Sequence, residues 1–361
     1  MTRFALGPTR GPIGLAIDGC LVRAAQVSRG RSGKRVLTTA TSFPRRSSES
    51  PTSGEILEIF GILERHGFRG SEVALWSGHA PVVSQFVDLP PRNSGAPIDQ
   101  IARGELSRAN RLDLSSFEMA MWDLPEIGGR SRGAGSQSMA VLLPHAEADR
   151  AVDAFVDTPL IVRSLEPLST ALARAVAPAI PAGVVLAVVL HVGWSASTLT
   201  VVNLEPVERR AIVVYERRLG EHGMDRLVSD SRAWRTGGMT AVRACLRRLS
   251  RDESPPSGPN FTDLRSRTTT YINALTMELE RSLQFVQRRF APLEATQCIL
   301  AGMCEGVRGL SERITSHLGL SARAVTPLEV MEVDPAVHSI AGSPEMLLPL
   351  GLALGWGGEG M

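Results

Sequence analysis

Two stretches of the chain share one pattern of apolar and polar positions, and each stretch opens one half of the sequence. They run from Ile13 to Val27 and from Val188 to Val202. Each begins with apolar residues, turns at a glycine among small or polar residues, and then resumes an apolar, β-branched pattern. The repetition predicts two strand-turn-strand hairpins in two related halves that face each other across a cleft.

Helical and strand patterns alternate along the rest of the sequence. The segment from Tyr271 to Phe290 places apolar residues at helical spacing, and the shorter segment from Glu55 to His66 does the same. The stretch from Val73 to Leu89 alternates like a pair of strands, and Met139 to Leu143 has the pattern of a buried strand. Strands that alternate with helices throughout predict an α/β protein.

Changes in pattern divide the chain into two lobes, and a smaller insert interrupts the first lobe. A Pro- and Ser-rich stretch in the second lobe, at 251–260, predicts a flexible surface loop, and the surrounding region 220–267 has no clear pattern. The first lobe is predicted to comprise two separate segments, 13–70 and 140–183, with the inserted subdomain at 71–139 between them. The second lobe is predicted at 184–356.

Composition excludes several classes of function. With 361 residues and a net charge of +2, the chain has no bulk attraction to nucleic acid or anionic lipid. None of its four cysteines forms a CxxC pair, so we predict no metal site. Pro178 and Pro181 interrupt the longest apolar stretch, at 175–194, which therefore does not predict a membrane span. The N-terminal residues lack the apolar core of a signal peptide, so we expect a cytoplasmic protein.

Several weak motifs follow one another between Ile13 and about Trp356, among them the segments EVALWSGHAPVVSQFVDLP, MELERSLQF, CILAGMCEGVRGL and LLPLGLALGW. Their order resembles the type IV pilus assembly protein PilM and, more distantly, the division protein FtsA. No single motif is specific, and the signal lies in their order and spacing. The resemblance implies the actin-like two-lobed fold of sugar kinases, Hsp70 and actin, with duplicated ribonuclease H-like cores and a small inserted subdomain in the first lobe.

The first hairpin corresponds to the first phosphate loop of that family, which reads roughly IGIDIGSSSIK. Laid on Ile13 without gaps, this pattern places Ala16 at the aspartate that approaches the metal and Asp18 at a glycine, followed by Gly19. Mg²⁺ prefers carboxylate and phosphate oxygens, and Ala16 supplies none. An anionic Asp18 would repel phosphates unless it held a metal from its shifted position on the same strand face. Only that arrangement would rescue the cleft for ATP and Mg²⁺.

The second hairpin departs from the family pattern in a similar way. His191 replaces the aspartate, Gly193 is retained, and a bulky Trp194 follows it. Ser195 could still donate a hydrogen bond to a phosphate. Because neutral histidine is a poor Mg²⁺ ligand, we interpret His191 as a hydrogen-bonded histidine at a strand end and not as a catalytic residue.

The family's glycine-rich adenosine loop corresponds to LAGMCEGVRGL. Gly302 is retained, but Met303 and Cys304 replace two glycines, and their side chains would crowd a backbone that must lie close to the base. All three nucleotide loops are therefore degenerate, and we predict no catalytic residue and no bound cofactor. Three helix residues match either the family's nucleoside-facing helix or an ordinary charged helix surface; they are Glu278, Arg281 and Ser282.

By this resemblance the chain is a scaffold, a pseudo-ATPase that kept the fold and lost the chemistry. Its implied partner is the cytoplasmic tail of a PilN-like bitopic protein of the inner membrane, in a type IV pilus, competence or type II secretion machine. Contact with the membrane would be indirect, through this partner, so the expected location is cytoplasmic and peripheral to the inner membrane. The inserted subdomain is the expected place of self-association or partner contact.

Two other functions stay open. One is an active actin-like ATPase or small-molecule kinase that binds ATP and Mg²⁺ in the interlobe cleft; the missing aspartates argue against it, because phosphoryl transfer depends on positioning and on neutralisation of charge by metal. The other is an FtsA-like filament protein bound to membrane by an amphipathic C-terminal helix. The C-terminal sequence LALGWGGEGM contains no basic, apolar helix, which argues against that interpretation.

Overall fold

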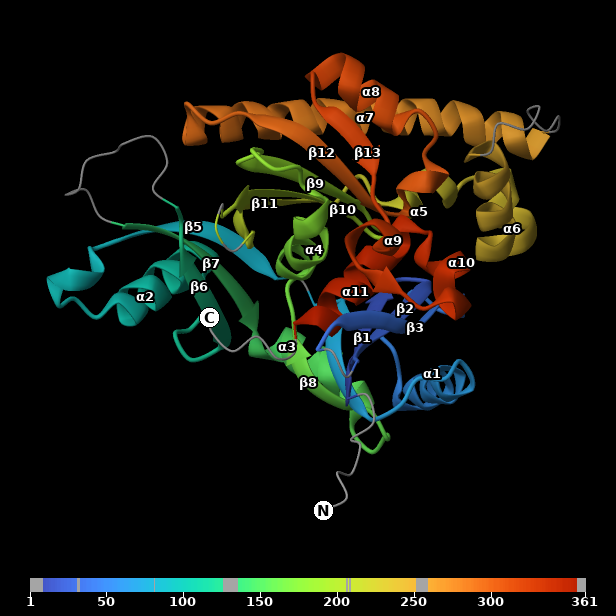
Figure 1. Cartoon of the computed structure of the whole chain (residues 1–361), viewed down its shortest axis with the longest axis horizontal. Coiled ribbons are helices and arrows are strands. Elements are labelled where there is room, and N and C mark those ends of the chain that lie inside the picture. The colour runs from blue at the N-terminus through green and yellow to red at the C-terminus, as the bar shows by residue number, and fades with distance from the viewer. Residues whose placement is uncertain are drawn as a thin grey trace.

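The computed structural model describes residues 9–30, 33–80, 82–125, 136–205, 207, 209–250 and 259–355. Within these ranges the strands form three sheets (Figure 1). The largest sheet has six strands in the order β14-β3-β2-β1-β4-β8. Its strands are β1 (Thr9–Asp18), β2 (Leu21–Arg29), β3 (Arg35–Pro44), β4 (Glu72–Ser77), β8 (Ile161–Leu165) and β14 (Glu332–Val333).

The five-stranded sheet of the second lobe repeats the strand order of the first. In the order β11-β10-β9-β12-β13, three antiparallel strands are followed by two parallel ones, as in β3-β2-β1-β4-β8. The duplicated topology confirms the two related halves that the paired hairpins predict, and the helices between the strands confirm the predicted α/β class. The strands are β9 (Leu186–Val192), β10 (Ser197–Leu204), β11 (Ala211–Leu219), β12 (Ala295–Gly302) and β13 (Ser321–Ala324).

Two apolar helices, α4 (Leu168–Val176) and α11 (Leu347–Leu354), lie between the two larger sheets (Figure 1). A helix that is apolar on all sides is typical of a buried position, and Leu347, Leu350 and Leu352 of α11 are fully buried. Each such leucine contributes about 1.5–3 kcal/mol through removal of its side chain from water. Because α11 contacts α4, β1 and β12, it holds the two lobes together.

Helices also cover the outer faces of both sheets. The long helix α7 (Pro259–Phe290) lies across the five-stranded sheet, and its buried residues follow the predicted spacing (Figure 1). On the six-stranded sheet, α1 (Ser53–Arg65) buries one apolar face, and the side-chain oxygen of Thr52 caps its first turn by accepting a hydrogen bond from the N–H of Glu55. Another helix that covers the second lobe is α8 (Leu310–Leu318).

The third sheet, in the order β5-β7-β6, forms the inserted subdomain together with helix α2 (Ile98–Asn110). Its strands are β5 (Val83–Leu89), β6 (Phe117–Asp123) and β7 (Ser136–Pro144). The predicted bounds of 71–139 do not follow this sheet, because β4 pairs with β1 in the first lobe and β7 continues to Pro144, where α3 (His145–Val152) follows. The alternation between Val73 and Leu89 resembles one pair of strands, but its two strands enter different sheets.

The C-terminal segment of the predicted second lobe, 184–356, returns to the first sheet. Strand β14 pairs in parallel with β3, and α11 packs on β1 and β2. Two short helices lie near β14, α9 (Pro327–Val330) and α10 (His338–Ala341). A two-residue strand leaves no periodic pattern in a sequence, so this crossing between the lobes could not be predicted.

The region 220–267, which has no clear sequence pattern, is helical where the structure describes it. It contains α5 (Met224–Val228), α6 (Arg232–Ser250), which is interrupted at Gly237 and Gly238, and the first turns of α7. Most of the predicted loop 251–260 lies outside the described residues, and α7 begins at Pro259. The apolar stretch 175–194 divides into the end of α4, a short 3-10 turn and β9. Among the described residues, none of the helices combines the length and apolar character that a membrane span requires.

Candidate functional site

Asp18 and Arg23 form a buried ion pair at the turn of the first hairpin. Asp18 ends β1 opposite Leu21 of β2, so Arg23 is its diagonal neighbour on the same face of the sheet. Arg23 Nη2 lies 3.2 Å from Asp18 Oδ2, and the two side chains are 0% and 1% exposed. A charge this deeply buried is costly unless it is paired and hydrogen-bonded, so each of these groups depends on the other.

The turn of the second hairpin donates two hydrogen bonds to the same carboxylate from the opposite lobe. The main-chain N–H of Trp194 donates to Asp18 Oδ2 at 2.6 Å, and Ser195 Oγ donates to Asp18 Oδ1 at 3.3 Å. Both donors lie in the turn between β9 and β10. The carboxylate of Asp18 therefore bridges the two turns that the sequence predicts to be phosphate loops.

Close packing around this bridge requires glycine at two positions. Gly19 has a φ of 52°, and a Cβ at this position would lie 2.0 Å from Trp194 Cδ1. A Cβ on Gly193 would lie 2.5 Å from the main-chain oxygen of Ala196 and 3.1 Å from Asp18 Oδ2. Gly193, which the chain shares with the phosphate-loop pattern, and Gly19, which stands at a serine of that pattern, thus allow the main chain to pack closely around the Asp18 carboxylate.

The side chain of Trp194 packs one lobe against the other. It is 5% exposed and belongs to a core cluster that also contains Cys20 and Leu21 of the first hairpin. Its ring lies 5.5 Å, centroid to centroid, from the ring of Trp234 in α6. Aromatic pairs of this kind contribute beyond their buried area, and the packing of Trp194 with the first hairpin gives it a structural role at the lobe junction.

The positions predicted to lack metal ligands have surroundings that differ from a metal site. Ala16 is fully buried in an apolar cluster with residues of α4 and α11. Asp18, the predicted position of a shifted ligand, directs both carboxylate oxygens to donors of Arg23, Trp194 and Ser195. In the described ranges of the chain, His, Cys, Asp and Glu side chains form no group of three or more that could hold a metal ion.

His191 lies near the end of β9, as predicted, but its environment differs from the prediction. The side chain is 1% exposed, and neither ring nitrogen has a hydrogen-bond partner within the described residues, so the interpretation of a hydrogen-bonded histidine is wrong. Its ring contacts the ring of Trp76 edge-on, at 6.3 Å between centroids. Burial, assisted by the nearby positive charge of Arg23, lowers the pKa of His191 to about 3, and the ring is therefore neutral.

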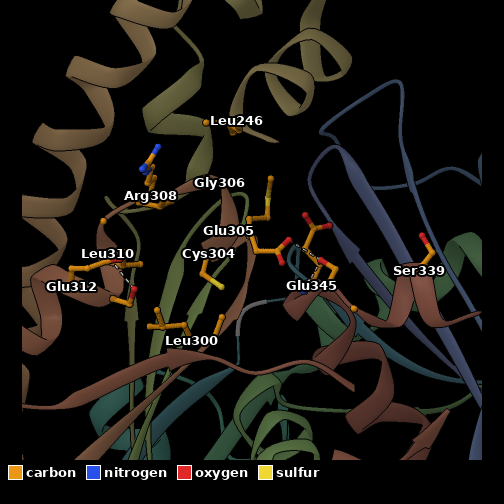
Figure 2. Close-up of a pocket in the computed structure, with 17 residues that line it drawn as sticks. Leu246, Leu300, Cys304, Glu305, Gly306, Arg308, Leu310, Glu312, Ser339 and Glu345 are labelled. Carbon is orange, nitrogen blue, oxygen red and sulfur yellow. Dashed lines mark hydrogen bonds between the residues drawn. The ribbon is translucent and has the colours of Figure 1, made fainter. Parts of the chain in front are cut away.

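The predicted adenosine loop borders a pocket of about 650 Å³ (Figure 2). Gly302 has a φ of 74°, and a Cβ there would lie 2.4 Å from the main-chain oxygen of Val192, so this position requires glycine. The side chains of Met303 and Cys304 are buried in the second-lobe core and also line the pocket. The charged residues of the lining are Glu305, Arg308, Glu312 and Glu345. With three carboxylates and one guanidinium, the lining has an excess of negative charge, which disfavours the binding of a triphosphate.

Two of the three predicted nucleoside-facing residues of α7 contact a strand of their own lobe, and the third pairs within the helix. Arg217 of β11 donates to Glu278 Oε2 and to Ser282 Oγ, both at 2.9 Å, and Arg281 pairs with Glu278. None of the three lines the pocket beside the adenosine loop. The structure thus does not bring them together with Gly302 and Met303, and their role toward a nucleoside stays a prediction.

Sequence reasoning overlooked Arg23, although a signal for it was present. In the ungapped comparison with IGIDIGSSSIK, Arg23 falls at the final lysine. A cation at this point of the loop pairs with the carboxylate of Asp18 at the glycine position. The carboxylate that departs from the pattern is thus neutralised by a cation of the same lobe.

Comparisons with known proteins identify the fold. No family model and no curated protein matches the sequence. A solved structure of a PilM-PilN type IV pilus biogenesis complex is similar with a TM-score of 0.74 and 20% identity, over 95% of this chain and 98% of that one. The chain has the actin-like fold in its PilM form. A nucleotide-free diol dehydratase-reactivating factor is similar with a TM-score of 0.51 and 9% identity, over 97% of this chain and 100% of that one.

The PilM-like fold confirms the predicted two-lobed, actin-like architecture. The likeness to the PilM-PilN structure extends over almost the whole of both chains, so the inserted subdomain and the C-terminal return to the first sheet are included in it. Within this fold, the carboxylate of Asp18 in the first lobe accepts hydrogen bonds from the turn of the second hairpin, which the sequence predicts to be a phosphate loop.

Proposed function

We propose that this chain is a PilM-like scaffold that binds the cytoplasmic tail of a PilN-like inner-membrane protein and works without nucleotide. The observation that carries the proposal is the likeness to a PilM-PilN complex over 95% of the chain, with a TM-score of 0.74. That likeness fits an adaptor, because the shape of the whole molecule is retained while the residues for metal and phosphate are replaced.

The geometry at the lobe junction supports a role without catalysis. Phosphoryl transfer requires metal and donors to neutralise the charge of the phosphates. Here Ala16 and His191 stand where the family has the aspartates that approach the metal. The carboxylate of Asp18 accepts the hydrogen bonds of the Trp194 N–H and the Ser195 hydroxyl. A nucleotide would have to displace a buried, ion-paired carboxylate before its phosphates reached those groups.

The setting of this scaffold is the inner face of a type IV pilus, competence or type II secretion machine. The protein is cytoplasmic, and its contact with the membrane passes through the bitopic partner. Short tails bind such scaffolds through apolar anchors and main-chain hydrogen bonds. We place the contact, and any self-association, on the inserted subdomain, where β5 and β6 are the outer strands of their sheet.

The direct test is binding of a tail peptide. A fluorescent peptide with the cytoplasmic sequence of the PilN-like protein encoded nearby is titrated with the purified chain, and a scrambled peptide of the same composition is the control. We expect saturable binding of the native sequence alone. Hydrogen exchange should then show added protection within 83–144, the segment of the third sheet.

The competing function, an active ATPase, is tested on the same preparation. Release of phosphate from ATP with Mg²⁺ is expected to equal that of a buffer blank. Turnover of ATP together with failure of the tail to bind would reverse the assignment. If the tail binds but protection from hydrogen exchange is confined to the pocket at 303–312, the scaffold function would be supported. The proposed location of the tail contact on the inserted subdomain would then be wrong.

A further inference from the structure

The carboxylate of Asp18 lies where hydrogen-bond donors from the two hairpins, one in each lobe, converge. It accepts from Arg23 Nη2 and the Trp194 N–H at Oδ2, and from Ser195 Oγ at Oδ1. We propose that this is an oxyanion site for a phosphate group, and that Asp18 is its permanent internal occupant. The proposal concerns the lobe junction alone and does not rest on the identity of the partner.

The chemistry of the donors fits an oxyanion. A main-chain N–H at a glycine turn, a hydroxyl and a guanidinium are the groups that hold phosphates in proteins. Arg23 is fully buried, and its Nε and Nη1 have no hydrogen-bond partner among the described residues. The site therefore offers more donors than the planar carboxylate of Asp18 uses, and a tetrahedral dianion could accept from them.

The packing explains why an outside anion is excluded. A Cβ on Gly78 would lie 3.1 Å from Asp18 Oδ1, and a Cβ on Gly193 would lie 3.1 Å from Asp18 Oδ2. The carboxylate is thus enclosed by main chain on two sides, and Trp194 covers the turn of Gly19. A phosphate cannot fit beside Asp18 within this enclosure, so the two anions compete for one position.

A second consequence concerns the two lobes. A bound phosphate would join the two hairpins by accepting from Arg23 of the first and from the turn of the second. Asp18 makes this connection as part of the chain, through hydrogen bonds of 2.6 and 3.3 Å to the opposite lobe. The lobes are consequently held together in the absence of any ligand, and their arrangement does not respond to the nucleotide supply.

The experiment removes the internal occupant and supplies an external one. Asp18→Gly deletes the carboxylate and restores the glycine of the phosphate-loop pattern. Its affinity for inorganic phosphate is measured by calorimetry, beside the wild type and the double variant Asp18→Gly/Arg23→Met. Because Asp18→Gly lacks the competing buried anion, it should bind phosphate at least about tenfold more tightly than the wild type does. A tenfold change in affinity is the effect expected of one charge-assisted hydrogen bond. The double variant, without the cation, should return to the wild-type level.

Two outcomes would overturn the proposal. The first is a folded Asp18→Gly variant, shown by circular dichroism, that binds phosphate no better than the wild type. The second needs no variant: in the wild type, hydrogen exchange at the Trp194 amide should be slow and unchanged by millimolar phosphate. Faster exchange, or further protection when phosphate is added, would mean that Asp18 does not occupy the site. Tail binding by the same variant is measured separately, so a failure of the scaffold function remains distinguishable.

Discussion

Glu216 of β11 accepts a hydrogen bond from Ser84 of β5 at 2.7 Å, which joins the second lobe to the inserted subdomain. The same carboxylate oxygen accepts from Ser169 of α4, also at 2.7 Å, so three regions of the molecule meet at one side chain. Desolvation raises the pKa of Glu216, and the two serine hydrogen bonds oppose that shift.

Glu216→Gln should therefore change the pH dependence of stability. Because the pKa of Glu216 is raised in the folded state, protonation of this side chain favours folding. That contribution to stability is complete below the ordinary pKa of 4.5 and is lost as pH rises through the raised pKa. Glutamine keeps an acceptor for the two hydroxyls and does not ionise. Urea unfolding at pH 5 and pH 8 should show the variant gaining stability relative to the wild type at the higher pH.

The companion variant Glu216→Ala removes both the charge and the acceptor, so its comparison with Glu216→Gln isolates the hydrogen bonds. It leaves the hydroxyls of Ser84 and Ser169 without their acceptor, and we expect a loss of about 1–3 kcal/mol in the free energy of unfolding. Equal stability of the alanine variant and the wild type at every pH would contradict the importance of this junction.

His191→Leu should remove a source of acid sensitivity. The pKa of His191 is lowered from 6.5 to about 3, mainly by burial. Between these two pH values the side chain is protonated in the unfolded chain but neutral in the folded chain. The wild type should lose stability as pH falls from 6.5 toward 3, by about 2 kcal/mol at pH 5 if 1.36 kcal/mol is counted per pH unit. Leucine has no proton to take up, and this slope should disappear in unfolding measured from pH 8 to pH 4.

The control for this variant is an exposed histidine at the C-terminal end of α1, His66. His66→Gln changes the histidine count by the same number but removes no buried ring. Its unfolding free energy should follow the wild-type curve between pH 8 and pH 4. A slope that persists in His191→Leu would assign the acid sensitivity to another group.

The repeated hairpins and the alternation of strand and helix patterns were sufficient to predict two related halves of the α/β class, because both arise from local periodicity of apolar residues; the actin-like fold itself was implied by the resemblance to PilM. Residue-by-residue comparison of the loops also located the unusual side chains at Ala16, Asp18 and His191. These predictions depend on neighbours in sequence or on a fixed strand register, which a sequence contains.

The partners of those side chains could not be predicted, since they depend on how the lobes meet. Asp18 and Trp194 are far apart in sequence, and only the packed structure brings the Trp194 N–H to the carboxylate. The loop pattern predicts that Asp18 would repel phosphate, but it contains no sign that Asp18 takes the donors itself. The unpartnered ring of His191 likewise results from tertiary packing against Trp76.

Magnesium should have no effect on the thermal stability of the wild type. A ligand that binds only the folded state raises the melting temperature, and the rise grows with the logarithm of the ligand concentration relative to its Kd. Both oxygens of Asp18 are committed to protein donors, which leaves a metal at the shifted position without its carboxylate. Melting curves in millimolar MgCl₂, with or without ATP, should match those in NaCl of equal ionic strength. A rise of several degrees specific to Mg²⁺ would restore the rescued-cleft alternative.

Arg23→Met should destabilise the protein more than removal of an exposed arginine from the same sheet. The substitution leaves Asp18 as a buried charge without its counter-ion, which costs about 3–5 kcal/mol in comparable sites. The matched control is Arg163→Met on β8, whose partner Glu72 on β4 is exposed; such pairs contribute about 0–1 kcal/mol. Adding Asp18→Asn to Arg23→Met should recover some of the loss, because no charge then remains. Equal losses in the two single variants would mean that the Asp18–Arg23 pair is not effectively buried in solution.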